Sequence, residues 1–358
     1  MPDRPQDGRF AEADGVVARG VADRRYPGAV LAVGDAAGAW HVRPFGSLGY
    51  DPGSPPVDDS TIYDLASLTK VIATTTLAMI LEEGGLDPTG AVSRFEPGFR
   101  GGEKDRASVE HLLTHAAGLP AWAPLFREAK GREAVVAAAA ATPLDAPPGA
   151  RSVYSDLGFI LLGAVLEAVA GRGLAALTED RVLRPLGMTE TRFNPGPEWL
   201  PRIAPTERDP WRGRLVHGEV HDENAFAMGG VAGHSGLFGP VADIVRFARM
   251  MLGKGELEGT RIASASKVER FTRRCSVPGS SRALGWNTPS PGSSAGTLLS
   301  PLSFGHTGFT GTSLWIDPER GVFVALLTNR IHPSREGTGI QELRAAVADA
   351  VVRGLGPC

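Results

Sequence analysis

The chain has 358 residues, which is enough for a large core and, by length, for about two domains. Apolar residues make up 42% and charged residues 22%, which is typical of a soluble globular protein. The formal net charge of -3 gives no reason to expect nucleic acid or an anionic membrane as a partner.

The start of the chain and its cysteines give no sign of export or of thiol chemistry. The first residues lack the apolar core of a signal peptide, and no apolar run reaches the length of a membrane span. A cytoplasmic location is therefore expected. Neither a disulfide between Cys275 and Cys358 nor thiol catalysis is expected.

The first half of the chain predicts a helix, two strands, a loop, a short extended run and then mostly helices. Apolar spacing and Gly/Pro punctuation place the first six elements at 10–24, 28–34, 39–43, 50–60, 61–65 and 71–83. Further helices are predicted at 109–115, 132–141, 157–170 and 241–252. The helix over 157–170 is apolar nearly all round and is expected to be buried.

Strands return near the C-terminus. They are predicted at 284–286, 303–307, 312–316 and 322–328. Residues 288–298 are rich in Pro, Ser and Gly and are expected to form a mobile surface loop. A helix over 340–352 closes the chain.

This order of elements predicts an α/β (α+β) fold. An antiparallel sheet is flanked by the N- and C-terminal helices, and a mainly helical domain is inserted into it. Residues 1–66 and 240–358 are assigned to the sheet domain, and residues 67–239 to the helical domain.

Ser67-Leu-Thr-Lys70 has the spacing of a nucleophile and a base on one helical turn. S-x-x-K is the nucleophile motif of β-lactamases and penicillin-binding proteins when later motifs accompany it. Ser264-Ala-Ser-Lys267 matches the same pattern, and an isolated match is more often a helix cap with a surface lysine. Only the first match is followed by a tyrosine, in Tyr154-Ser-Asp156, and then by His306-Thr-Gly308.

With these motifs in this order, the chain resembles the serine β-lactamase and penicillin-binding-protein superfamily. The similarity is to the class C β-lactamase-like branch, with its family VIII esterase and D-aminopeptidase relatives. The matching segments are Leu65-Ala-Ser-Leu-Thr-Lys70, His111-Leu-Leu-Thr-His-Ala-Ala-Gly-Leu-Pro120, Tyr154-Ser-Asp156, Gly229-Gly-Val-Ala-Gly-His-Ser-Gly-Leu-Phe238 and Gly305-His-Thr-Gly308. The resemblance implies the architecture given above, with the active site in the groove between the two domains.

The resemblance also assigns roles to residues. Ser67 is implied as the acylated nucleophile, Lys70 as the base beside it and Tyr154 as the partner that relays the proton. The implied oxyanion hole consists of the backbone N–H groups of Ser67 and Phe309. The implied substrate-binding residues are Asp156, His306, Thr307, Gly308 and Phe309.

Two positions depart from the family pattern. Asp156 stands where the β-lactamases and many peptidases have asparagine, and an aspartate there could pair with Lys70 and keep it protonated. His306 replaces lysine, and a neutral imidazole is a poorer anchor for a substrate carboxylate than an ammonium group. Both changes point away from an efficient β-lactamase and leave ester cleavage open.

Two histidine pairs and one serine motif offer other chemistry. His111 with His115, and His217 with His221, have the spacing of a metal pair, but neither has the adjacent glutamate of a zinc-protease helix. His115 is instead expected to hydrogen-bond the following turn, whereas His221 and His234 either line the cleft or pack within loops.

Gly292-Ser-Ser-Ala-Gly296 matches the G-x-S-x-G elbow of Ser-His-Asp hydrolases. That elbow needs a strand before it and a helix after it, whereas this match lies in a Pro/Ser/Gly-rich loop. We therefore interpret it as a chance match.

The sequence predicts a serine hydrolase that acylates Ser67 and passes the acyl group to water, with carboxylic esters or small amides as substrates. A D-alanyl-type carboxypeptidase or a β-lactamase is the alternative enzyme. An acylatable ligand-binding or sensor module with little turnover is the alternative of another class. No cofactor, metal, nucleic acid or membrane partner is expected.

Overall fold

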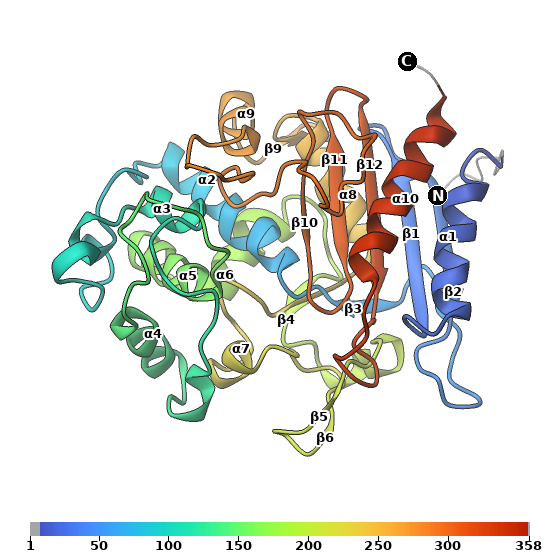
Figure 1. The fold of residues 1–358 in the computed structure, drawn as a ribbon, viewed down its shortest axis with the longest axis horizontal. Coiled ribbons are helices and arrows are strands. Elements are labelled where there is room, and N and C mark those ends of the chain that lie inside the picture. Colours follow the sequence, from blue (N-terminus) through green and yellow to red (C-terminus); the bar gives the residue numbers. More distant parts are fainter. Residues whose placement is uncertain (1–7, 357–358) are drawn as a thin grey trace.

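The computed structural model describes residues 8–356 and is organised around a five-stranded antiparallel sheet (Figure 1). The strands are β1 (Gly28–Gly34), β2 (Ala39–Gly46), β10 (Phe304–Thr307), β11 (Ser313–Asp317) and β12 (Val322–Thr328). Their order in the sheet is β10-β11-β12-β1-β2. The N-terminal hairpin and the C-terminal strands therefore complete one sheet, and β10 forms its edge.

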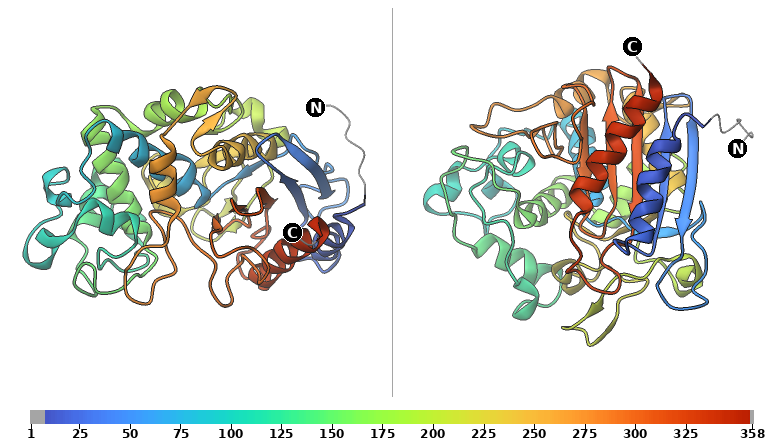
Figure 2. Two further views of the ribbon diagram at one scale, coloured as in Figure 1. Left: turned by 90° about the horizontal axis from the view of Figure 1, so that it is seen from above. Right: turned by 45° about the vertical axis from the view of Figure 1, so that its right-hand side comes forward.

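Both faces of this sheet are covered by helices. α1 (Ala11–Ala22) and α10 (Ile340–Leu355) lie side by side over one face (Figure 2), and α8 (Val241–Leu252) packs against the other. Successive residues of a strand point to opposite faces. Accordingly Leu31 of β1 joins the apolar cluster under α1 and α10, whereas Val30 joins the main core on the side of α8.

The other helices gather beside the sheet, in the left half of Figure 1. They are α2 (Thr76–Glu83), α3 (Val109–Leu113), α4 (Arg132–Ala141), α5 (Asp156–Ala170), α6 (Leu174–Thr178), α7 (Glu223–Ala227) and α9 (Ala265–Thr272). α5 is contacted by α2, α3, α4 and α6, and its residues 157–166 are buried, as the apolar pattern predicts. The predicted boundaries of the two domains stay a prediction.

Short strands connect these two regions. β3 (Ile62–Asp64), β7 (Leu237–Pro240) and β4 (Arg192–Phe193) form a three-stranded antiparallel sheet. Two further hairpins consist of β5 (Arg208–Asp209) with β6 (Arg214–Leu215), and of β8 (Glu256–Leu257) with β9 (Thr260–Arg261). β3 ends three residues before Ser67, so this small sheet fixes the approach to the serine.

The strand predicted at 284–286 is wrong. Gly285 has φ of 80°, which breaks the extended conformation that a strand requires. The segment instead makes isolated bridges, from Arg282 to Asn287 and from Asn287 to Gly305 of the edge strand β10. It therefore lies beside the edge of the sheet as an irregular loop.

The expectation of a mobile surface loop at 288–298 is wrong for the centre of that segment. Ser294 and Ala295 are buried, and the indole N–H of Trp315 in β11 donates to Ser294 Oγ at 3.0 Å. The carboxylate of Asp349 in α10 accepts the backbone N–H groups that follow. Tertiary packing therefore overrides the polar composition of this loop.

Among residues 8–356 no single helix is long and apolar enough to cross a membrane. Only α5 taken together with residues 174–183, at a bend of 74°, meets the length and composition of a span.

Candidate active site

Ser67 stands at a sharp turn between strand and helix. Ala66 has φ of 46°, a left-handed conformation that is strained for a residue with a Cβ. The buried carboxylate of Asp64 holds this turn, because it accepts the Ala66 N–H at 2.8 Å and the His221 N–H at 2.7 Å. The helix that follows begins with a π-helical segment, Lys70–Thr75, before continuing as α2.

Lys70 is the fully buried partner of Ser67. Its Nζ lies 2.9 Å from Ser67 Oγ, 2.7 Å from Asp156 Oδ1 and 3.1 Å from the carbonyl oxygen of His234. Burial by itself lowers the pKa of Lys70, but its interactions with Asp156 and Tyr154 outweigh burial, so the pKa lies above its ordinary value. Lys70 is therefore held as an ammonium ion.

Tyr154, which lies two residues before α5, also contacts Ser67 Oγ. Its hydroxyl donates to Ser67 Oγ at 2.9 Å. The ring is packed against His115, with ring centroids 4.7 Å apart, and the guanidinium of Arg282 lies 4.9 Å from its centroid. Burial is the main cause that raises the pKa of Tyr154, and Lys70 opposes it without reversing it. The side chain is therefore a neutral phenol.

His306 lies on the edge strand β10 and lines the same cavity as Ser67 and Tyr154. Its Nδ1–H donates to the carbonyl of Thr307 at 2.9 Å, and its buried Nε2 has no partner among the described residues. Burial, followed by the charges of Lys70 and Arg282, lowers the pKa of His306 well below its usual value. The imidazole is therefore neutral.

The implied oxyanion donors meet at this cavity. Within residues 8–356, neither the Ser67 N–H nor the Phe309 N–H donates to a protein acceptor, and both residues line the cavity. Free backbone N–H groups of this kind are suited to bind a developing oxyanion. The cavity has a volume of about 610 Å³ and is also lined by Asp156, Thr307 and Gly308. All the site residues predicted from the sequence therefore line it except Lys70, which is buried and contacts Ser67.

Comparison with known proteins identifies the family of the chain. The family model described as Beta-lactamase matches residues 13–349. The chain belongs to the beta-lactamase family. A protein of Escherichia coli (strain K12) with the name "Putative D-alanyl-D-alanine carboxypeptidase" is 35% identical over 307 residues, which cover 76% of this chain and 70% of that protein.

Solved structures show the same fold. The octameric penicillin-binding protein homologue from Pyrococcus abyssi has a TM-score of 0.76 at 25% identity and covers 96% of this chain and 77% of its own. EstCE1, described as a hydrolase with promiscuous acyltransferase activity, has a TM-score of 0.74 at 20% identity and covers 97% and 99%. The predicted fold, a mixed helical and antiparallel β-lactamase-like architecture, is thereby confirmed.

Two arginines of this beta-lactamase-family site, Arg282 and Arg344, were not predicted from the sequence. Among the described residues no carboxylate pairs with Arg282 or Arg344, although both line the cavity. Arg344 donates to the carbonyls of Gly308 and Thr312 at 2.8 Å, and burial, followed by the charge of Arg330, lowers its pKa to about 9. Burial likewise lowers the pKa of Arg282. Neither lies in a motif, so the sequence carries no signal for them.

The side chain of Phe309 is 48% exposed and is held between two groups. The ring of His221 stacks on it, with centroids 5.8 Å apart and planes at 22°, and the guanidinium of Arg330 lies 4.6 Å from its centroid. Arg330 Nε also donates to the Phe309 carbonyl at 2.9 Å. These contacts orient the residue whose N–H faces the cavity.

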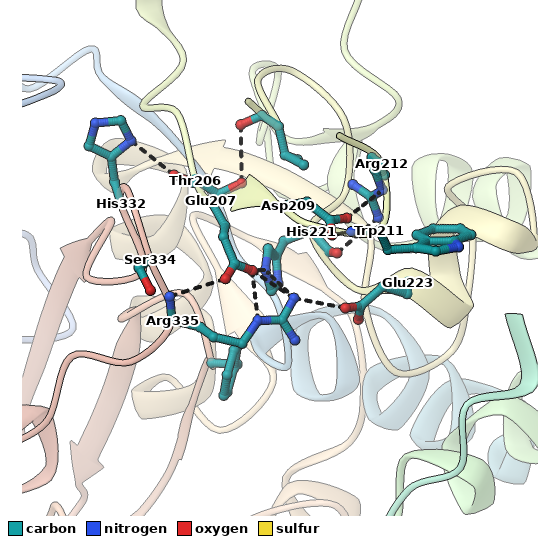
Figure 3. A network of polar contacts seen from close by, with 12 residues as sticks. Thr206, Glu207, Asp209, Trp211, Arg212, His221, Glu223, His332, Ser334 and Arg335 are labelled. Carbon is teal, nitrogen blue, oxygen red and sulfur yellow. Dashed lines mark hydrogen bonds and ion pairs between the residues drawn. The ribbon is translucent and has the colours of Figure 1, made fainter. Parts of the chain in front are cut away.

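His221 belongs to a charged network with Glu207 and Arg335 (Figure 3). His221 Nε2 donates to Glu207 at 2.8 Å, and Arg335 bridges Glu207 and Glu223 at 2.7 Å to each carboxylate. Burial opposes the charge of Glu207, but the hydrogen bonds from His221 and Arg335 lower its pKa to about 2. The network joins the 207–221 segment, α7 and the segment before α10.

The side chains of the two histidine pairs are placed as follows in the described part of the chain. No cluster of three or more His, Cys, Asp or Glu side chains with metal-ligand spacing occurs in residues 8–356. The expectation for His115 is wrong in its partner: Nδ1 accepts the Ser155 N–H at 3.0 Å, from a segment 40 residues away. His217 Nε2 donates to the Ile203 carbonyl at 2.8 Å, and both His221 and His234 line the cavity.

The two other serine motifs lie away from the cavity. Ser264 precedes α9, and Lys267 pairs with Glu82 at 2.6 Å. Ser294, in the G-x-S-x-G match, has neither a strand before it nor a helix after it. Within the described residues, the S-x-x-K match at Ser67 alone faces a tyrosine.

Proposed function

We propose that the protein is a serine hydrolase that cleaves carboxylic esters or small amides through an acyl-enzyme on Ser67. The observation that carries this proposal is the placement of Lys70 Nζ and the Tyr154 hydroxyl, each 2.9 Å from Ser67 Oγ at the floor of a cavity of about 610 Å³. The beta-lactamase family and the fold shared with EstCE1 support it.

In the proposed reaction, Ser67 Oγ attacks the carbonyl carbon of the substrate. The Ser67 and Phe309 N–H groups stabilise the negative charge that develops on the carbonyl oxygen, and one such donor is typically worth about 10²–10³ in turnover. The leaving group departs with a proton, and an ester of Ser67 remains. Water then attacks the same carbon, and Ser67 recovers its proton as the acid is released.

Covalent labelling tests this proposal. After reaction with a fluorophosphonate, intact-mass spectrometry should show one adduct, and peptide mapping should place it on Ser67. The Ser264 peptide serves as the internal control and should stay unmodified. An adduct on another residue, or no adduct, would contradict the assignment. A p-nitrophenyl acetate adduct that persists would instead support the acylatable sensor module.

A carboxypeptidase-type activity is the second candidate. It is favoured by the guanidinium of Arg282, which donates to Asn287 but pairs with no carboxylate among residues 8–356. A cavity wall that carries an uncompensated positive charge suits a substrate with a free carboxylate, and the Escherichia coli relative carries a D-alanyl-D-alanine carboxypeptidase name. In this chain Arg282 would supply the anchor that the neutral His306 does not.

Arg282→Gln should therefore act selectively on substrates with a carboxylate. With N-acetyl-D-alanyl-D-lactate as substrate, we expect kcat/KM to fall by about 10–100-fold, which is the loss of one or two charge-assisted hydrogen bonds. The methyl ester of the same compound is the matched control and should be hydrolysed at a nearly unchanged rate. Equal losses on both substrates would count against this second function.

A further inference from the structure

The hydrogen bonds of Lys70 leave its nitrogen without a way to accept a proton. An ammonium group has three N–H donors and no acceptor. Each of the three oxygens around Nζ, on Ser67, Asp156 and His234, lies within 3.1 Å, and the side chain is 0% exposed, so the ion is fully coordinated and dry. While Lys70 keeps its proton, it holds the Ser67 hydroxyl but does not deprotonate it.

Tyr154 does not supply the missing base either. Its hydroxyl donates to Ser67 Oγ, so in the resting site Ser67 accepts hydrogen bonds from both neighbours. His306 has a free Nε2, but this atom makes no hydrogen bond to Ser67 or Lys70 among the described residues. Because Lys70 and Tyr154 both donate to Ser67, the base must lie beyond them, at a distance of one further hydrogen bond.

Asp156 is the carboxylate that contacts this group of side chains. Its Oδ1 lies 2.7 Å from Lys70 Nζ, and the side chain is 18% exposed to the cavity. Its second oxygen, Oδ2, has no partner among the described residues and is not buried. Asp156 is also the first residue of α5, whose N-cap is the preceding Ser155, so its carboxylate is not used to cap the helix.

We propose that Asp156 is the proton acceptor of this site, and that Ser67, Lys70 and Asp156 form a proton relay. The inference rests on the proposed serine hydrolase and adds the group that receives the proton. As Ser67 Oγ bonds to the carbonyl carbon, its proton moves to Lys70 Nζ while a Lys70 proton moves to Asp156 Oδ1. The products of this step are an alkoxide-derived tetrahedral adduct, a Lys70 ammonium and a neutral Asp156 carboxylic acid.

One proton then leaves with the first product. Asp156 returns its proton to Lys70 while Lys70 gives a proton to the oxygen or nitrogen of the leaving group, as the carbonyl reforms. In the second half-reaction, water bonds to the acyl carbon and passes a proton to Asp156. The Ser67–acyl bond then breaks, and Ser67 Oγ takes that proton back through Lys70. No other reactant is needed, and each cycle returns the resting charges.

The other ionisable groups around this pair do not replace Asp156. Those that face it from the adjoining elements are His115, Tyr154, Asp222, His234, Arg282 and His306. Burial, followed by the charges of Arg282 and Lys70, lowers the pKa of His115 well below its usual value, as it does for His306, so both imidazoles stay neutral. Asp222 is engaged by His234, whose Nε2 lies 2.7 Å from Asp222 Oδ1.

The pH dependence of the wild-type enzyme tests the relay. Because the relay starts from the ammonium form of Lys70, whose pKa lies above its ordinary value, log kcat/KM on a p-nitrophenyl ester should be level from about pH 6.5 to about pH 9. If a free Lys70 amine were the base, the rate would rise about tenfold per pH unit over that range. A unit slope would overturn the relay and leave the Ser67-dependent hydrolase intact.

A second measurement uses Asp156→Ala with formate as an external carboxylate. At neutral pH we expect kcat to fall by about 10²-fold or more with little change in KM, and formate to restore part of it in a concentration-dependent way. Lys70→Met is the matched control and should show no recovery, because the relay is broken before Asp156. Full activity of Asp156→Ala, or equal recovery in both variants, would overturn the proposal. If Asp156→Ala does not fold, the wild-type slope decides.

Discussion

Replacing Ser67 by alanine is expected to reduce ester hydrolysis by about 10⁴-fold or more, because the substitution removes the oxygen that forms the acyl-enzyme. Among the described residues, the Ser67 oxygen alone contacts both Lys70 and Tyr154. Release of p-nitrophenol from short-chain esters measures the effect. Binding should survive the change, since the cavity and its two backbone donors remain.

The chain provides its own control for this experiment. Ser264 belongs to the second S-x-x-K match, where its hydroxyl lies 3.2 Å from that of Ser266 in an exposed position at the start of α9. Ser264→Ala should retain wild-type activity. Comparable losses in both serine variants would contradict the assignment of Ser67, as would an unchanged rate in Ser67→Ala.

Lys70→Met should reduce kcat by about 10²–10⁴-fold while KM changes little. Methionine fills most of the same buried volume, but it removes the charge that holds Ser67 Oγ and Asp156 together. The loss therefore falls on the chemical step rather than on substrate binding. Steady-state kinetics with p-nitrophenyl esters separates the two parameters, and near-UV circular dichroism reports whether the core is preserved.

Lys267→Met is the matched control for the second prediction. Lys267 Nζ pairs with Glu82, which Arg270 also contacts, so a partner remains after the substitution. Such a partly exposed pair contributes about 0–1 kcal/mol to stability. Wild-type kinetics are expected for Lys267→Met, and a KM effect of Lys70→Met larger than its kcat effect would indicate a binding role for Lys70 instead.

Much of the fold follows from local patterns. The strands of the central sheet lie where the apolar runs predict them. The two helices that cover one face of the sheet, α1 and α10, lie at the two ends of the chain as the periodicity indicates. The pairing of Ser67 with Lys70 is also local, since residues three apart in a helix share a face. The order of the motifs then distinguishes Ser67 from Ser264 without any coordinates.

Two local predictions were wrong for physical reasons that a sequence does not show. Gly285 takes a left-handed conformation, so the apolar run around it does not extend as a strand. The polar loop at 288–298 is drawn into the structure by Trp315 and Asp349, which lie far along the chain. In both cases the conformation of the segment depends on its contacts with residues far along the chain.

The sequence by itself determined the family, the central sheet and the three side chains at the nucleophile, because these depend on short-range spacing and on motif order. Only the tertiary structure decided the charges around them. The Lys70–Asp156 pair joins residues 86 apart, and Arg282 is a candidate binding residue only because the fold places it in the wall of the cavity. Burial and charge partners set the proton on each group, and both arise when segments distant in the chain pack together.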